Sequence, residues 1–277
     1  MMCAWQALLS ILPIWMRQDV DAKGKETLQE LRLRINSPPE LVLNGKSLWL
    51  DRQVSPEDIR FCVNVASRYS PWAAETIRKG YITAPGGHRI GLCGEAAVKD
   101  LDLIRIREVT SICIRVARDF PGIAKNLENG TSSVLILGAP GWGKTTLLRD
   151  LARCIALRSL VAVIDERGEL FPQGIARGKR MDVFTGCPKP AGVEAVLRTM
   201  GPEYIAVDEI TAPEDGKAVM HAAGCGVKLL ATAHAGSFRD FQTHSIYREI
   251  WERGIFDLYV MMRRDKSYCV ERRALCS

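Results

Sequence analysis

Nine consecutive residues carry the clearest chemical signal in this sequence: Gly138, Ala139, Pro140, Gly141, Trp142, Gly143, Lys144, Thr145 and Thr146. They fit the pattern G-x-x-x-x-G-K-[ST] and lie between an apolar run typical of a buried strand and a segment typical of a helix. Glycine at the bends lets backbone N–H groups approach phosphate oxygens without obstruction. Lys144 would then reach the β- and γ-phosphates of a nucleotide, and the Thr145 hydroxyl would bind Mg²⁺. The stretch predicts a binding loop for ATP and Mg²⁺; the alternative is a glycine-rich turn without a ligand.

Two pairs of acids follow apolar runs further along the chain, Asp165 with Glu166 and Asp208 with Glu209. The carboxyl ends of parallel strands meet at one edge of a sheet, which is also the edge that carries a phosphate-binding loop. We therefore expect Asp208 to help hold Mg²⁺ and Glu209 to activate the attacking water. Glu166 is the alternative for the second role. Acids that merely cap the following helices are the structural alternative for both pairs.

One further strand end carries polar groups, within the sequence KLLATAH at residues 228–234. Thr232 and His234 would lie near the γ-phosphate if this strand joins the same sheet edge. His234 is a candidate sensor that reports the γ-phosphate to neighbouring elements. A histidine with a purely structural role is the alternative.

After residue 131, apolar runs alternate with longer segments, and these would hold the residues described above. Four short apolar runs are separated by segments long enough for helices, and they cover residues 134–137, 161–164, 204–207 and 228–232. Apolar strands that alternate with helices are typical of a parallel sheet buried on both faces. The second half therefore predicts an α/β fold of the P-loop NTPase (RecA-like) type, with helices on both faces of a parallel sheet.

The first half has a mixed pattern. Apolar and charged residues alternate within 28–35, which predicts a half-buried strand, and Ser55 before a proline and two acids predicts a helix start. Further strands are expected at residues 40–43, 46–50, 80–83, 88–94 and 111–117, and helices at 4–11, 55–69, 71–79 and 119–129. We predict a small N-terminal α+β domain over residues 1–125 and the P-loop ATPase domain over 126–277, with the boundary between 119 and 131.

The overall composition narrows the class of protein. The 277 residues are 47% hydrophobic and 25% charged, which is ordinary for a globular protein and excludes a disordered or fibrous chain. A net charge of +6 suits phosphate ligands, an anionic membrane surface and nucleic acid alike. The nine cysteines contain no Cys-x-x-Cys pair, which argues against a zinc site or disulfide framework and favours a reducing, cytoplasmic compartment. The apolar run at residues 4–16 is too short to span a bilayer and lacks the flanks of a signal peptide.

The order of these motifs resembles that of the ATPases of type II and type IV secretion systems and of pilus motors. Residues 197–209 (LRTMGPEYIAVDE) resemble the segment that leads to the acidic strand end in those proteins, and residues 231–234 (ATAH) resemble their His box. The chain resembles more closely the family of stage III sporulation protein AA, a member of this group. The stretches that carry this resemblance span nearly the whole chain: residues 11–13, 30–34, 88–94, 111–115, 143–150, 165–167 and 182–189.

The resemblance implies a ring-forming ATPase, expected to be a hexameric homo-oligomer, that is cytoplasmic and peripheral at the membrane of the mother cell. Its expected partners are integral-membrane proteins of a sporulation channel. In related motors arginines of N-terminal strands reach the nucleotide, and Arg89 and Arg115 match those positions. A cation there would stabilise the γ-phosphate during transfer, whereas the alternative is a pair of solvated strand arginines. The family usually carries Gly-Arg after the acid that matches Glu209, but this chain has Ile210 and Thr211, so that arginine role is not carried over.

We expect an ATP-hydrolysing motor that energises assembly of, or transport through, a membrane channel complex during endospore formation. Two hypotheses from other classes stay open. A nucleic-acid-handling P-loop ATPase would need a surface of basic and aromatic residues, of which the first domain shows little, so nucleic acid is not an expected partner. A nucleotide-controlled scaffold with little turnover would need only one acid for Mg²⁺, and the chain offers Glu209 and Glu166 besides Asp208.

Overall fold

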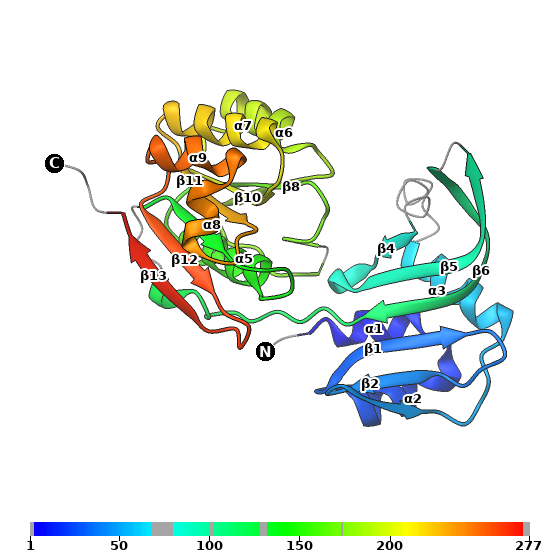
Figure 1. Ribbon diagram of the computed structural model, residues 1–277. Coiled ribbons are helices and arrows are strands. Elements are labelled where there is room, and N and C mark those ends of the chain that lie inside the picture. The colour runs from blue at the N-terminus through cyan, green and yellow to red at the C-terminus, as the bar shows by residue number, and fades with distance from the viewer. Residues whose placement is uncertain (1–2, 68–79, 100–101, 128–131, 173, 274–277) are drawn as a thin grey trace. The chain divides into compact units, whose positions relative to one another are not determined.

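The computed structural model describes residues 3–67, 80–99, 102–127, 132–172 and 174–273. The chain forms two compact units, and Figure 1 shows the elements of each. The first unit comprises Met1–Asp119 and Pro172–Ile175, and the second comprises Phe120–Phe171 and Ala176–Ser277. The helix predicted at residues 71–79 lies outside the described residues. The domain limits drawn from the sequence at residues 125 and 126 stay a prediction.

A six-stranded sheet organises the first unit. Its order is β3-β2-β1-β6-β5-β4, and each neighbouring pair is antiparallel. The strands are β1 (Leu28–Arg34), β2 (Glu40–Leu43), β3 (Lys46–Trp49), β4 (Tyr81–Thr83), β5 (Arg89–Lys99) and β6 (Asp102–Arg115), with a 3-10 turn η2 (Pro85–Gly87) between β4 and β5. Strand β6 pairs with β1 on one side and β5 on the other, so it joins the early and late parts of this unit.

The two faces of this sheet differ in character. Leu31 and Leu33 of β1 belong to a buried cluster that includes residues of the helices α1 (Trp5–Ile11), α2 (Ile14–Gly24) and α3 (Pro56–Ser67). The alternate residues Arg32 and Arg34 remain partly exposed on the opposite face. The alternation predicted for residues 28–35 is therefore confirmed, and it leaves a charged face opposite the helices.

A seven-stranded sheet organises the second unit, in the order β13-β12-β7-β11-β10-β8-β9. All neighbouring pairs are parallel except β12 with β13. The strands are β7 (Val134–Leu137), β8 (Val161–Asp165), β9 (Met181–Thr185), β10 (Tyr204–Ile210), β11 (Lys228–Ala233), β12 (Leu258–Met262) and β13 (Tyr268–Arg272). The predicted parallel sheet is confirmed, and its four predicted strands are neighbours at its centre. Strands β9, β12 and β13 were not predicted.

Helices cover both faces of this second sheet. Leu135 and Leu137 of β7 belong to a buried cluster with residues of α6, α7 and α9, whereas Leu148 and Leu151 of α5 are fully buried outside that cluster. Figure 1 accordingly shows α6 and α7 together on one side of the sheet and α5 on the other. The helices are α5 (Lys144–Ile155), α6 (Lys189–Thr199), α7 (Pro213–Gly224), α8 (Phe238–Thr243) and α9 (Ser245–Glu252).

The helix predicted over residues 119–129 is wrong in its described part. Only a 3-10 turn, η3 (Lys125–Leu127), forms there. Gly122 has a φ of 90°, which an α-helix does not tolerate. The Ala124 N–H donates to the carboxylate of Asp150 in α5 at 2.9 Å, so a side chain supplies the acceptor that a helix would have taken from its own backbone.

The apolar run near the start of the chain is part of a core. Residues 4–16 form α1 and the beginning of α2, and Leu8, Ile11 and Met16 are fully buried. Within the described ranges, no helix is long and apolar enough to cross a membrane.

Candidate active site

The phosphate-binding loop predicted from the sequence connects β7 to α5, which begins at Lys144. Gly138, Gly141 and Gly143 have φ values of 154°, 74° and 101°, so three of its bends use backbone conformations that favour glycine. A Cβ atom on Gly138 would lie 2.9 Å from the Cβ of Met262, which is closer than such atoms approach. The placement of the loop between a buried strand and a helix is as the motif requires. The nucleotide contacts of its residues stay predictions.

Lys144 lies largely buried among polar atoms of the second unit. Its Nζ atom donates to the Ala139 carbonyl at 3.1 Å and lies 3.1 Å from Nδ1 of His234. Burial lowers the pKa of Lys144, while the carboxylates of Glu209 and Asp208 act in the opposite direction. The ammonium is therefore poorly solvated, and an anion placed beside it would gain a strong interaction.

Asp208 lies near the carboxyl end of β10 and links the start of α5 to β11. Its Oδ2 accepts a hydrogen bond from the Thr145 hydroxyl at 3.1 Å, and its Oδ1 accepts one from the Thr232 hydroxyl of β11 at 2.7 Å. Burial raises the pKa of Asp208, and the two hydroxyl groups partly oppose that shift. The structure thus brings the two predicted Mg²⁺ ligands, Thr145 and Asp208, together.

Glu209 adopts a strained backbone conformation, with a φ of 47°. The register between β10 and β11 is irregular at this point, and the Glu209 N–H donates to Oγ1 of Thr232 at 2.8 Å. One carboxylate oxygen of Glu209 contacts Nε2 of His234, and the other lies 3.3 Å from Arg167. His234 therefore touches both Lys144 and Glu209, which joins the loop to the acidic strand end.

The two acids at the end of β8, Asp165 within the strand and Glu166 directly after it, have different surroundings. Asp165 is buried and accepts hydrogen bonds from the backbone N–H groups of Glu169 and Phe171 at 2.8 and 2.9 Å, so it orders the following loop. Glu166 lies 2.6 Å from the buried ammonium of Lys189, which is also 3.6 Å from Asp215. A small cavity joins the two acidic strand ends and is lined by Asp165, Glu166, Arg167, Lys189, Asp208 and Glu209.

Sequence reasoning missed Arg167 and Lys189 as members of this cluster. Each contacts a carboxylate far along the chain, Glu209 in the first case and Glu166 in the second. Arg167 directly follows the Asp165-Glu166 pair, which was a signal that could have found it. No local pattern indicates Lys189, because its position at the start of α6 places it beside β8 only in the folded sheet.

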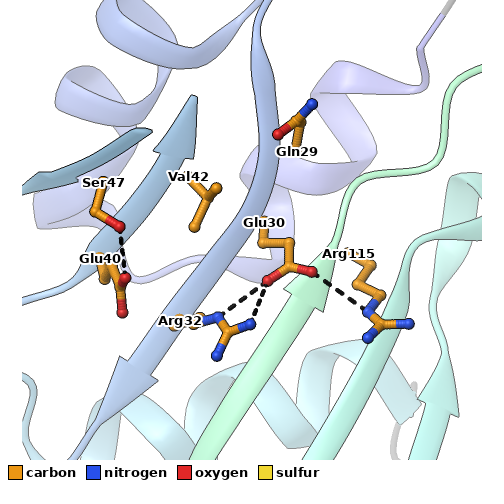
Figure 2. Close-up of a pocket in the computed structure, with 7 residues that line it drawn as sticks. All are labelled: Gln29, Glu30, Arg32, Glu40, Val42, Ser47 and Arg115. Atoms are coloured by element: carbon orange, nitrogen blue, oxygen red, sulfur yellow. Dashed lines mark hydrogen bonds and ion pairs between the residues drawn. The ribbon is translucent and has the colours of Figure 1, made fainter. Parts of the chain in front are cut away.

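Arg89 and Arg115 lie in the first unit, on neighbouring strands and in register. Figure 2 shows the Glu30 carboxylate between the guanidinium groups of Arg32 and Arg115, at 2.6 and 3.6 Å. The hydrogen bond from Arg32 is the main reason that the pKa of Glu30 is lowered. The guanidinium of Arg89 lies 4.5 Å from the ring centre of Tyr81. Contact of either arginine with a nucleotide stays a prediction.

Comparison with protein families covers almost the whole chain. The model described as sporulation stage III, protein AA, matches residues 6–271. The chain is 36% identical over 256 residues to stage III sporulation protein AA of Bacillus subtilis (strain 168), covering 86% of this chain and 83% of that protein. It is also 30% identical over 243 residues to the protein SEEDLING PLASTID DEVELOPMENT 1 of Arabidopsis thaliana, covering 82% of this chain but only 33% of that longer protein.

Solved structures share the fold. The ATPase DotB of Legionella pneumophila superposes with a TM-score of 0.58 at 17% identity, covering 94% of this chain and 80% of that chain. The pilus retraction motor PilT, solved with bound ADP, superposes with a TM-score of 0.60 at 15% identity, covering 91% and 78%. These likenesses confirm the predicted P-loop NTPase fold and its resemblance to the folds of an ATPase and a pilus motor.

Proposed function

Since the chain belongs to the family of stage III sporulation protein AA, we propose that it is an ATP-hydrolysing motor for a membrane channel complex in endospore formation. The observation that carries this proposal is the series of contacts from Lys144 through His234 to Glu209, beside the pair of Thr145 and Asp208. One cluster at the strand ends thus supplies a phosphate-binding cation, oxygen donors for a metal ion and a carboxylate base.

The loop and its neighbours fit ATP and Mg²⁺. The glycines at 138, 141 and 143 keep side chains away from the bends, and the Lys144 ammonium lies at the start of α5, where the helix dipole also favours an anion. Thr145 and Asp208 present oxygen atoms 3.1 Å apart, which are the donors that Mg²⁺ prefers. Bound Mg²⁺ would supply charge neutralisation at the phosphate oxygens.

Glu209 is the residue that we assign to proton abstraction from the attacking water. His234 and Arg167 each hold one of its carboxylate oxygens, so the carboxylate is oriented at the sheet edge that carries the loop. Glu166, the alternative, forms an ion pair with the buried Lys189, which occupies one of its oxygens. Glu209 is linked through His234 to Lys144 of the loop, whereas Glu166 contacts Lys189 at the start of α6. This link to the loop favours Glu209 as the base and gives Glu166 a structural role between β8 and α6.

His234 is the residue that we assign to γ-phosphate sensing. A phosphate group that binds the Lys144 ammonium competes with Nδ1 of His234 for the same donors. Because the other ring nitrogen of His234 contacts Glu209, a change at Lys144 is transmitted directly to the base. The sensor would thus couple arrival of the γ-phosphate to the position of Glu209.

The proposal extends to assembly. We propose a hexameric ring in which Arg89 and Arg115 reach a nucleotide, located in the mother cell cytoplasm against the membrane and bound to integral-membrane proteins of a channel. Family membership and the exposed position of Arg115, 69% exposed on the charged sheet face, support this part of the proposal. A cation delivered from a strand would stabilise charge on the transferred phosphate.

The experiment compares ATP binding and phosphate release in the full chain and in three variants. Glu209→Gln is expected to bind ATP like the parent and to lose hydrolysis by a factor of about 10² or more, because an amide cannot accept the proton of water. Glu166→Gln is expected to keep most of the activity. Glu214→Gln, at an exposed acid in the first turn of α7, is the matched control for loss of one negative charge. If Glu166→Gln stops hydrolysis and Glu209→Gln does not, the base is Glu166. If the parent binds ATP without releasing phosphate, the protein is a nucleotide-controlled scaffold.

A further inference from the structure

The hairpin of β12 and β13 ends in an ordered turn at residues 263–267. The Arg263 N–H donates to the Ser267 carbonyl at 2.8 Å, and the Lys266 N–H donates to the Arg263 carbonyl at 3.0 Å. The Asp265 carboxylate accepts from the N–H and the hydroxyl of Ser267 at 3.0 and 2.7 Å. These hydrogen bonds fix the turn, so they also fix where the stem of Lys266 begins.

This hairpin packs against the phosphate-binding loop. Lys266 Nζ donates a hydrogen bond to the carbonyl of Gly141. The stem of Lys266 passes over Gly143, where an added Cβ would lie 3.7 Å from Lys266 Cδ and 3.6 Å from Met262 Cε. The ammonium of Lys266 therefore contacts the loop at Gly141, and its stem leaves room at Gly143 for little more than a Cβ atom.

The backbone of Lys266 is an unusual one for its residue type. Its φ is 71°, in the left-handed region where glycine and asparagine are favoured in hairpin turns. Glycine would fit the turn without strain but would bring no side chain to Gly141. Strained conformations of this kind concentrate at functional sites, because the surrounding structure maintains them for what the side chain does.

We propose that Lys266 is a second cation of the nucleotide site and binds the polyphosphate chain of ATP or ADP together with Lys144. This assignment rests on the proposed nucleotide-binding function and adds a residue from outside the loop motif. The ammonium has three donors, of which the contact with Gly141 uses one. Unlike the buried Lys144, Lys266 is exposed, so its ammonium can turn from the carbonyl to a phosphate oxygen without losing solvation. Its ligand class is a nucleoside di- or triphosphate.

The test measures dissociation constants of ATP and ADP for the full chain by isothermal titration calorimetry, at fixed salt. Lys266→Gln keeps a donor for the Gly141 carbonyl and removes the charge, and Lys266→Gly removes the charge and relieves the backbone. Both are expected to weaken binding of ATP and ADP by about 5- to 10-fold, the effect of losing a charged hydrogen bond at an exposed position. Arg264→Gln, in the same turn, is the matched control for loss of one positive charge and is expected to stay within twofold of the parent.

The affinities of the variants separate a charge effect of Lys266 from a structural one. Equal affinities of Lys266→Gln and Arg264→Gln would overturn the proposal and leave Lys266 as a structural contact of the loop. If only Lys266→Gly weakens binding, the hydrogen bond to Gly141 and not the charge matters, which also overturns it. Lys144→Ala serves as the reference for the loop. Failure of the parent chain to bind ATP would contradict the nucleotide-binding function itself and is thus distinct from failure of the Lys266 assignment.

Discussion

Replacement of Thr232 by valine is expected to weaken the connection between the two central strands of the second unit. The Thr232 side chain is fully buried, and its hydroxyl donates to Oδ1 of Asp208 at 2.7 Å and accepts from the Glu209 N–H at 2.8 Å. Valine has nearly the same shape but can make neither hydrogen bond. The substitution therefore removes two polar contacts while it leaves the packing almost unchanged.

The expected loss follows from the two hydrogen bonds. A hydrogen bond to a charged group contributes about 1.5–3 kcal/mol and a neutral one about 0.5–1.5 kcal/mol, so their joint loss lowers the free energy of unfolding by about 2–4 kcal/mol. Thr232 also lowers the pKa of Asp208 in opposition to burial, so its loss raises that pKa further. Mg²⁺ binds the ionised carboxylate, and Mg²⁺-dependent nucleotide binding by the variant is therefore expected to require a higher pH than in the parent.

Hydrogen–deuterium exchange at the amides of β10 and β11 measures the loss of stability in the second unit alone. Urea unfolding gives the free energy of unfolding of the whole chain. Thr232→Ser is the control, because it keeps both hydrogen bonds and loses one buried methyl group, at a cost of about 1 kcal/mol. If the amides of β10 and β11 exchange as slowly in Thr232→Val as in Thr232→Ser, the hydroxyl does not hold Asp208 and Glu209 in place.

Three further predictions concern other parts of the molecule. Gly138→Ala is expected to destabilise the loop by about 1–3 kcal/mol and to weaken ATP binding, because its φ is 154° and its Cβ would lie 2.9 Å from Met262 Cβ; Gly224→Ala, where nothing lies within 4 Å, is the control in the same binding and unfolding measurements. Burial and Arg118 lower the pKa of His88 below its ordinary value of 6.5. Just below pH 6.5, His88 therefore binds a proton in the unfolded chain but not in the folded one. The free energy of unfolding of the first unit should therefore decrease as the pH is lowered from 6.5 until it passes the pKa of His88 in the folded state. In urea unfolding, His88→Gln should remove this pH dependence. In the full chain, Arg115→Ala is expected to lower phosphate release by about 10- to 1000-fold and to weaken ATP-dependent oligomerisation, as measured by sedimentation on the same samples. A variant that assembles and hydrolyses like the parent would make Arg115 a solvated strand residue.

Local sequence patterns predicted the parts of the fold that depend on local chemistry. The loop at residues 138–146 follows from the glycines and Lys144, and the four central strands follow from their apolar runs. The alternation in β1 correctly predicted which face is buried. The failure at residues 119–129 also has a local cause, since Gly122 favours a left-handed bend, but the Asp150 carboxylate that completes this turn lies in a distant helix.

The shared sheet edge was predicted, but the individual contacts that side chains make there and elsewhere with distant segments were not. Lys189 joins Glu166 only because α6 packs beside β8, and Lys266 reaches Gly141 only because β12 lies next to β7 in the sheet. In the same way, the strand order places Thr232 beside Asp208 and Glu209, although Thr232 lies one strand later in the chain. Strand pairing depends on the whole core, so single-residue patterns identify the chemistry of such groups but not their partners.

We propose that the cluster around Lys144 binds and hydrolyses ATP. Phosphate release from ATP by the purified full chain, measured beside Lys144→Ala and with Mg²⁺ present or chelated, tests it most directly. Release by the parent is expected to require Mg²⁺, and Lys144→Ala is expected to lose both release and most ATP affinity, since Lys144 supplies the buried ammonium of the loop. Release by Lys144→Ala at the rate of the parent would contradict the assignment of this loop as the catalytic nucleotide site.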